Sequence, residues 1–247
     1  MKTVDKALSV LDQFSLDHTE IGLSELARMA DLDKAATRRL LVAMEKHGFI
    51  EQHQQTRKYR LGHGFLRLAR IREATVPLAK AAQEVCDWLV NQTGETAHVA
   101  VPTAHGMATV AHRLPRRGHV VTVEPAQILL FHATASGLAF MAFASDSRKE
   151  AALTQRREKI TEATLTSKTD VLHAIKKTRH QGFARTTDTF ETGVASIAIP
   201  FFADAVDPAG TVALALPRAD LTDQRCTDLL PVLQQAVSQI EIALRGL

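Results

Sequence analysis

Residues 23–52 read LSELARMADLDKAATRRLLVAMEKHGFIEQ, and this stretch decides how the first part of the chain folds. Apolar residues recur at helical spacing from Leu26 to Ala30, and Ser24 is a typical N-cap residue for that short helix. Asp33 is a typical N-cap residue for a second helix, whose apolar face continues to Met44. Because only ADLD (30–33) separates the two patterns, the helices must meet at a steep angle. The stretch therefore predicts a helix-turn-helix.

The residues that follow predict a basic hairpin. Gly48 is a typical helix-ending residue, and FIEQHQQTRKYRLG (49–62) then alternates as two strands around a polar tip. Such a hairpin is a wing, so the unit, with a first helix from Val4 to Phe14, is a winged helix-turn-helix. A basic strip suits a polyanion, and a solvated basic surface is the alternative. Residues 52–72 contain no carboxylate and these six cations: Arg57, Lys58, Arg60, Arg67, Arg70 and Arg72.

This arrangement predicts binding to double-stranded DNA. A helix fits the major groove, and the side chains near its N-terminus reach base edges, while cations on a wing reach phosphates or the minor groove. Arg39 lies one step around the helix and is expected to contact phosphate or to brace the motif. A winged helix that binds protein is the alternative. The expected DNA-binding residues are Ser24, Lys34, Ala35, Thr37, Arg38, Arg39, Arg57, Lys58 and Arg60.

The composition is that of an ordinary globular protein. The 247 residues suggest about two domains, with 45% hydrophobic and 23% charged residues and a formal net charge of +3. One Trp and one Tyr argue against a stacking platform for single-stranded nucleic acid. We find no signal-peptide pattern and no apolar run long enough to span a membrane. Cys86 and Cys226 lie in apolar helical patterns, so we expect a cytoplasmic protein with reduced core thiols and no membrane partner.

The periodicity of the remaining chain predicts a linker helix and an α+β domain. Residues 63–76 continue as a helix with an apolar stripe that one copy leaves exposed, which suggests pairing with a second copy. Pro77 then restarts the helix. Short strands joined by tight turns follow, including MATVAHRL (107–114) and HVVTVE (119–124), with helices predicted at 147–158, 170–180 and 222–245. A mainly antiparallel sheet flanked by helices is the expected architecture.

At this point the chain resembles the isocitrate-lyase-regulator (IclR) family of bacterial transcription factors. The resemblance covers nearly the whole length and rests on several segments in order: the helix-turn-helix quoted above, TGETAHVAV, FHATASGLAFMAF, RHQGFARTTDTFETGVASIAIPFF and LTDQRCTDLLPVLQQAVSQIEIAL. It implies a DNA-binding transcriptional regulator in which dimers or tetramers bind a palindromic operator. We therefore expect a winged helix-turn-helix domain at 1–62, a linker helix at 63–76, and a GAF-like domain for effector binding and oligomerisation at 77–247.

The resemblance also implies a pocket for a small effector over the sheet. Family members that bind very small keto acids tend to have hydroxyl or acidic groups where this chain has Thr186, Ala213 and Ala215, so we expect a larger effector, such as an aromatic or medium-chain organic acid. Arg113, His98 and His132 are the candidates to pair with its acid group. Each has a structural alternative, such as a surface ion pair or a hydrogen bond to the backbone. The positions carried over from the family are Val121, Val123, Ala135, Ser136, Thr186, Ser196, Ala213 and Ala215.

His98, His105, His112 and His119 occur at intervals of seven, which raises the question of a metal site. A two-residue turn at His105–Gly106, which we favour, would place His98 opposite Arg113. A three-residue loop would place His98 opposite His112 and make a metal-responsive regulator the alternative function. Only Glu95 lies nearby as a further ligand type, so no metal is expected.

An enzyme with a winged-helix appendage is the remote alternative. The sequence has no GxSxG, HExxH or CxxC motif and no phosphate-binding glycine loop. We therefore expect neither an enzymatic activity nor a cofactor.

Overall fold

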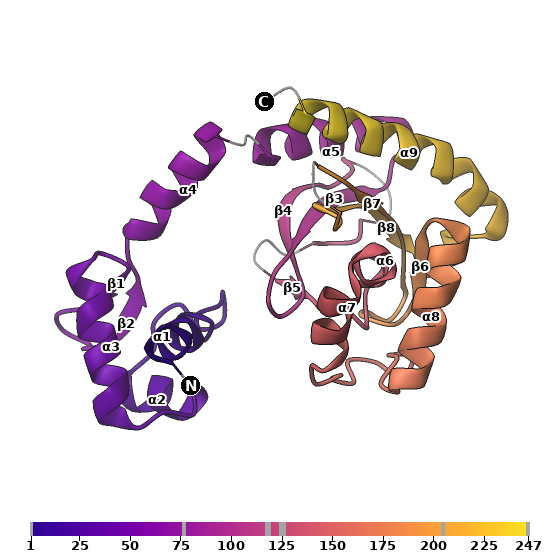
Figure 1. Cartoon of the computed structure of the whole chain (residues 1–247). Helices are drawn as coiled ribbons and strands as arrows, with labels where there is room; N and C mark the ends of the chain where they lie inside the picture. The colour runs from indigo at the N-terminus through magenta and orange to yellow at the C-terminus, as the bar shows by residue number, and fades with distance from the viewer. Residues whose placement is uncertain (1, 76–77, 117–119, 124–126, 204–205, 246–247) are drawn as a thin grey trace. The chain divides into compact units, whose positions relative to one another are not determined.

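The computed structural model describes residues 2–75, 78–116, 120–123, 127–203 and 206–245. The chain forms two compact units, Met1–Thr75 and Val76–Leu247 (Figure 1).

The first unit is a winged helix-turn-helix, as the sequence predicts. Its helices are α1 (Thr3–Leu11), α2 (Leu23–Met29) and α3 (Lys34–Lys46), and its antiparallel hairpin pairs β1 (Ile50–Gln52) with β2 (Tyr59–Leu61). Their apolar faces share one core, which contains Val10, Ile21, Leu26, Leu40, Leu41, Met44, Ile50 and Tyr59. The N-cap of α2 is Gly22, so the expectation that Ser24 caps this helix was wrong; Ser24 lies inside its first turn.

Close backbone contacts join the end of α3 to helix α4 (Gly64–Thr75). Gly48 has φ +74°, the left-handed conformation that glycine adopts at helix ends. A Cβ on Gly62 would lie 2.3 Å from the carbonyl oxygen of Gly48, so only glycine fits there. The rings of Phe49 and Phe65 also meet edge to face, 5.1 Å apart. No described residue of α4 is buried, so most of the surface of this helix is open to solvent beyond Phe65.

The second unit has three layers (Figure 1). The central antiparallel sheet has the order β5 (Ile128–Leu129), β4 (Met107–Arg113), β3 (Thr96–Pro102), β8 (Gly210–Pro217), β7 (Val194–Phe201) and β6 (Ala184–Thr187). Helices α5 (Leu78–Thr93) and α9 (Asp223–Arg245) cover one face, and α6 (Ala135–Phe143) covers the other, with α7 (Asp146–Leu153) and α8 (Lys168–Gln181) packed against it. A 3₁₀ turn, Arg218–Asp220, precedes α9. The expected α+β class is confirmed.

Helix α6 packs on the sheet through small residues. Every residue of α6 except Phe143 is buried. Beneath it the sheet presents Ala198 and Ala213, which are paired across β7 and β8. At Gly137 even a Cβ would lie 2.4 Å from the Cα of Phe131. The small residues around ATASG therefore let the first turn of α6 pack closely against the segment that precedes it.

The register of β3 and β4 corrects the sequence prediction at His98. The N–H of Thr103 donates to the Gly106 carbonyl oxygen at 2.8 Å and closes the turn between the two strands. Neither the two-residue turn nor the three-residue loop considered from the sequence pairs Thr103 with Gly106. A bulge after Val99 then shifts the register by one residue. His98 therefore lies opposite His112, and the expectation that it faces Arg113 was wrong.

Two further expectations need correction. The predicted strand 119–124 is not a strand at 120–123, and its remaining residues, His119 included, lie outside the described part. The charged helix expected to reach Glu158 ends at Leu153. The linker, α8 and the last helix appear where the periodicity placed them, within the described residues.

Candidate functional site

The N-terminus of α3 presents exposed cations. Asp33 caps the helix, since its Oδ1 accepts a hydrogen bond from the Ala36 N–H at 2.7 Å. Lys34 and Arg38, together with Ala35 and Arg39, are exposed along the first turns. Thr37 is fully buried, and its hydroxyl donates to the Asp33 carbonyl at 2.9 Å. The structure therefore places Thr37 in the packing of the motif, which corrects the expectation that its side chain is free to meet a base.

The tip of the wing is fixed by its own hydrogen bonds. The Nδ1 atom of His53 accepts from the N–H groups of Gln55 (3.3 Å) and Thr56 (3.2 Å). Gln52 donates to the carbonyl of Arg57 at 2.8 Å, and Arg57 itself has φ +58°. These bonds hold Arg57 and Lys58 in exposed positions at the tip.

The structure brings four of the expected DNA-binding residues together at one surface groove. Ser24 comes from α2, Lys34 and Arg38 from α3, and Arg57 from the wing. Three cations and one carboxylate, that of Glu25, line this groove, so its charge is positive on balance and suits a polyanion. Ala35, Arg39, Lys58 and Arg60 lie outside its lining.

Arg60 is already paired within the unit. Its Nε and NH2 atoms each lie 3.1 Å from Oε2 of Glu51, and NH1 lies 4.0 Å from Glu20. The hydrogen bond from Arg60 is the main reason that the pKa of Glu51 is lowered. A phosphate would have to compete with this carboxylate for Arg60.

A pocket opens in the second unit between the sheet and the first turn of α6. Its empty volume is about 570 Å³, including the part open to solvent. Eight of the expected effector residues line it: His98, Val121, Val123, Ala135, Ser136, Thr186, Ser196 and Ala215. The other lining residues are Thr122, Gln127, Leu129, Thr134, Thr189, Phe190, Glu191 and Val194.

Strand register explains why residues distant in sequence meet in this pocket. Thr186 pairs with Ser196, and Ser196 pairs with Ala215, so the three side chains lie in a row on one face of the sheet. Thr96 continues the row on β3, and its hydroxyl donates to the Val121 carbonyl at 2.7 Å. That bond ties the segment 120–123 to the edge of the pocket.

His98 is the buried titratable side chain of the pocket. Its Nε2 atom lies 3.2 Å from Oγ of Ser136, and the residue is 5% exposed. Burial, and secondarily the neighbouring His112, lower its pKa to about 4. The ring is therefore neutral near pH 7. Its hydrogen bond with the Ser136 hydroxyl joins two uncharged groups. Its Nδ1 atom is buried and has no partner among the described residues.

The first turn of α6 supplies hydrogen-bond donors to the pocket. Thr134 caps the helix by accepting from the Gly137 N–H at 3.1 Å. The N–H groups of Ala135 and Ser136 are the first two of the helix and have no acceptor within it. They also carry the partial positive charge of a helix N-terminus. Together with the Ser136 hydroxyl, they can bind a carboxylate.

Three expected effector residues lie elsewhere. Arg113 pairs with Asp87 at 2.8 Å and does not line the pocket. The Nε2 atom of His132 lies 2.9 Å from the Glu158 carbonyl, and burial lowers its pKa. Ala213 lies in the core beneath α6. The suggestion that Arg113 or His132 meets the effector's acid group is therefore corrected, and the pocket contains no Lys or Arg among its described lining residues.

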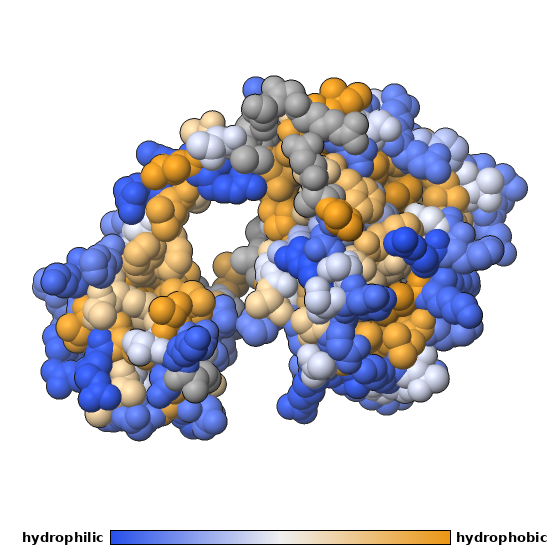
Figure 2. All heavy atoms as spheres, viewed as in Figure 1, coloured by the Kyte–Doolittle hydropathy of each residue, from blue (hydrophilic) through white to orange (hydrophobic). Residues whose placement is uncertain are grey.

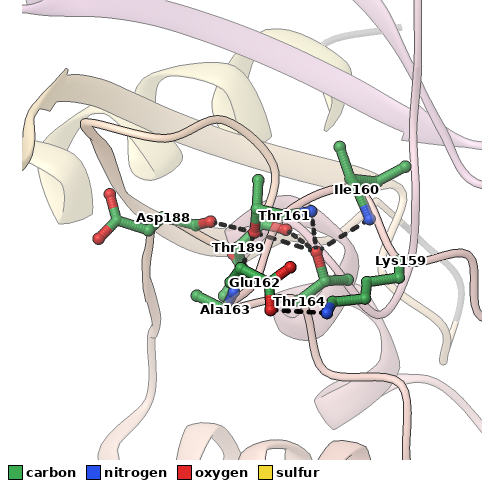
Figure 3. A network of polar contacts seen from close by, with 8 residues as sticks. All are labelled: Lys159, Ile160, Thr161, Glu162, Ala163, Thr164, Asp188 and Thr189. Carbon is green, nitrogen blue, oxygen red and sulfur yellow. Dashed lines mark hydrogen bonds and ion pairs between the residues drawn. The ribbon is translucent and has the colours of Figure 1, made fainter.

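The loop between β6 and β7 forms a wall of the pocket that sequence reasoning missed. Thr189, Phe190 and Glu191 line it. Figure 3 shows Thr161 and Thr164 on a neighbouring loop donating hydrogen bonds to the carbonyls of Asp188 (2.5 Å) and Thr189 (2.7 Å). The signal was present in the sequence, because DTFETG is a polar loop between two strands that both carry pocket residues.

The histidines do not form a metal cluster in the described part of the chain. No group of three or more His, Cys, Asp or Glu side chains there is arranged to hold a metal ion. His98 and His112 lie opposite each other, but His98 uses its Nε2 atom on Ser136. Nor does any helix of the described residues have the length and apolar character to cross a membrane.

Both units match known protein families. Residues 3–54 match the family described as the IclR helix-turn-helix domain, and residues 74–242 match the family described as the bacterial transcriptional regulator IclR C-terminal domain. The chain belongs to the IclR family. It is a transcriptional regulator and not an enzyme, which confirms the expectation from the sequence.

Individual relatives agree over nearly the full length. The putative IclR transcriptional regulator from Silicibacter sp. TM1040 is 35% identical, with a TM-score of 0.92 over 99% of this chain and 97% of that one. The regulator XynR of Escherichia coli is 24% identical over 96% of this chain and 94% of its own length. An IclR homologue from Microbacterium hydrocarbonoxydans, in complex with 4-hydroxybenzoate, shares the fold with a TM-score of 0.73 at 19% identity, each chain being fully covered.

Proposed function

We propose that this IclR-family regulator binds operator DNA through α3 and the wing, and that a small organic acid in the pocket controls that binding. The acid is aromatic or of medium size. The observation that carries the proposal is the pocket itself, which has largely apolar walls and hydrogen-bond donors from the first turn of α6 at its buried end. The protein acts in the cytoplasm, where its operator is.

The lining favours an effector with one acid group and an apolar body. Ala135 and Ser136 offer backbone N–H groups to a carboxylate, and Ser136 adds a hydroxyl. The walls between the first turn of α6 and solvent are largely apolar. They favour a ligand that buries a ring or a short chain against them. They consist of Val121, Val123, Leu129, Phe190 and Val194. One relative supports this class, the homologue crystallised with 4-hydroxybenzoate.

Exposed apolar residues support self-association. On α4 the exposed fractions of Leu66, Leu68 and Ile71 are 62%, 43% and 52%, and on α1 those of Val4 and Leu8 are 68% and 54%. Figure 2 shows apolar side chains among charged ones along α4. We propose that a second copy covers them, giving a homodimer or a dimer of dimers. Residues 1–62 then bind DNA, 63–76 link the parts, and 77–247 bind the effector and oligomerise.

Control by the effector requires a difference in its affinity between two states of the oligomer. An effector that binds the DNA-competent and the incompetent arrangement equally well shifts nothing. The coupling is reciprocal, so operator DNA must change effector affinity by the same factor by which the effector changes operator affinity.

The test begins with operator selection. The protein is used to select binding sequences from a pool of random duplex DNA, and fluorescence anisotropy then measures operator affinity with and without each member of a panel of aromatic and aliphatic acids. A thermal-shift screen with the same acids, with and without a metal chelator, identifies ligands independently of DNA. We expect a palindromic site, a shift of affinity with an aromatic or medium-sized acid, and no effect of the chelator.

The proposal has clear ways to fail. If no duplex is selected from the pool, the proposal that the protein binds an operator is wrong. Tightest binding of glyoxylate-sized acids, with none of aromatic ones, would remove the proposed effector class.

A further inference from the structure

The pocket has one buried end and one open end. At the buried end His98, Ala135 and Ser136 are nearly inaccessible to solvent. At the open end the pocket shares four residues with an adjoining surface groove: Thr122, Gln127, Phe190 and Glu191. Thr122, Gln127 and Glu191 are exposed. A ligand whose carboxylate lies on the first turn of α6 therefore directs its far end toward these residues.

Glu191 is held at this opening by a loop that is fixed on both sides. Asp188 has φ +59°, its carboxylate accepts from the Gly193 N–H and from Arg218 at 2.7 Å each, and its N–H donates to the Val194 carbonyl at 2.8 Å. Val194 N–H in turn donates to the carbonyl of Glu191 at 3.3 Å. The loop cannot carry Glu191 away without breaking these bonds.

A further set of bonds anchors the same loop to its neighbours (Figure 3). The hydroxyl of Thr189 donates to the Ala133 carbonyl at 2.6 Å, just before α6. Thr164 donates to the Thr189 carbonyl at 2.7 Å and itself accepts from the N–H of Thr161 at 2.8 Å. The opening of the pocket and the start of α6 are thus parts of one hydrogen-bonded assembly.

The charge of Glu191 is uncompensated at this place. It is the one carboxylate among the described residues that line the pocket, and none of those residues is Lys or Arg. Within the described chain its carboxylate makes no ion pair or hydrogen bond. A negative charge at the open end repels a second negative charge on a ligand and accepts a hydrogen bond from a hydroxyl.

We propose that Glu191 is a specificity residue that makes the pocket select monocarboxylates with a hydroxyl at the far end and reject dicarboxylates. This inference rests on the proposed function, since it takes the effector acid to lie with its carboxylate on the first turn of α6. The mechanism is electrostatic repulsion of a far carboxylate, combined with a charge-assisted hydrogen bond from a far hydroxyl.

The test compares ligands that differ only at the far end. Isothermal titration calorimetry on the full-length protein measures binding of 4-hydroxybenzoate, 4-methoxybenzoate and terephthalate, and of the aliphatic pair hexanoate and adipate. We expect 4-hydroxybenzoate to bind most tightly in its series. Each dicarboxylate should bind about tenfold or more weakly than the best monocarboxylate of its series.

The variant Glu191→Gln keeps the shape and removes the charge. We expect it to tighten binding of terephthalate and adipate by about fivefold or more, because the repulsion is gone. Binding of 4-hydroxybenzoate should weaken, because an amide accepts a weaker hydrogen bond than a carboxylate. The matched control is Glu162→Gln on the neighbouring loop, where Glu162 is exposed and pairs with Lys159 at 2.7 Å; all affinities should stay at the wild-type values.

The outcomes separate this inference from the proposed function. If monocarboxylates bind but dicarboxylates bind as tightly, or if Glu191→Gln leaves the ratio between them unchanged, the role of Glu191 is overturned and the acid pocket stands. If no acid of either series binds, the proposed effector class falls and the role of Glu191 falls with it.

Discussion

The Nε2 atom of His98 lies 3.2 Å from Oγ of Ser136, and this contact joins strand β3 to the first turn of α6 at the buried end of the pocket. Without this contact, the Nε2 atom of His98 on β3 and the hydroxyl of Ser136 on α6 would each be a buried polar group with no partner. Paired, they give the ligand a hydroxyl that is held in one position by a neutral ring.

The first prediction concerns this hydroxyl. Ser136→Ala should weaken binding of the best acid by about 1 kcal/mol, since one hydrogen bond to the carboxylate is lost. Calorimetry measures the change. Ser196→Ala is the matched control, because the Ser196 hydroxyl already donates to the Leu214 carbonyl at 2.9 Å and has less to offer a ligand. Equal losses of acid affinity in both variants would contradict the role of the Ser136 hydroxyl in binding the carboxylate.

The second prediction concerns pH. His98 has a folded-state pKa of about 4, below its ordinary value of 6.5, so the unfolded chain binds its proton first as the pH falls. His98 therefore contributes stability that is fully present above about pH 6.5 and is lost as the pH falls toward 4, up to about 3 kcal/mol. His98→Gln should lose less stability than the wild type over the same interval.

Trp88 on α5 is the chain's one tryptophan, so its fluorescence during urea unfolding reports on the unit that contains His98. His173→Gln, an exposed change on α8, is the control and should keep the wild-type dependence on pH. An identical acid slope in wild type and His98→Gln would contradict the prediction.

These residues show what sequence could and could not predict. The winged helix and the long helices were predictable because their periodicity and capping are local, as with Asp33, the N-cap of α3, and Gly182, the C-cap of α8. The position of His98 was not, because a bulge after Val99 shifts the register and no turn residue signals it. Thr189 was missed because a bond from Thr164, on a loop distant in sequence, holds it at the pocket. Glu191 lies two residues further along the same loop and was missed with it. Thr37 was misassigned because its side chain is buried and its hydroxyl donates to the Asp33 carbonyl.

The third prediction concerns self-association through α4. Ile71→Glu places a charge in the proposed contact, where burial without a partner is costly, and should raise the dissociation constant of the oligomer about tenfold or more. Sedimentation velocity over a range of concentrations measures it. Leu172→Glu on α8 changes a residue that is 41% exposed and should leave the oligomer intact. The proposed interface is wrong if Ile71→Glu sediments like the wild type.

The fourth prediction concerns phosphate contacts by the wing. Lys58→Ala should weaken binding to all duplexes alike and reduce the slope of log affinity against log salt by about one. Arg60→Ala is the control, because Arg60 is already paired with Glu51 at 3.1 Å and should change the slope less. A loss at Lys58 that depends on DNA sequence would contradict the wing assignment.

The fifth prediction concerns base recognition by α3. Arg38 is exposed near the N-terminus of α3 and lines the same groove as Lys34 and Arg57, so it is placed to reach a base edge. Arg38→Ala should weaken binding to the selected operator by about 1–3 kcal/mol and relax the sequence preference at one position of each half-site. Binding to random duplex should weaken far less.

Anisotropy titrations against the operator and against operators changed at single positions measure both effects. Lys46→Ala, an exposed cation in the last turn of α3, is the matched control and should keep the full preference at every position. If Arg38→Ala lowers affinity for operator and random duplex by the same factor, Arg38 contacts only the backbone, and the base contacts of α3 must come from Lys34 or from the wing tip.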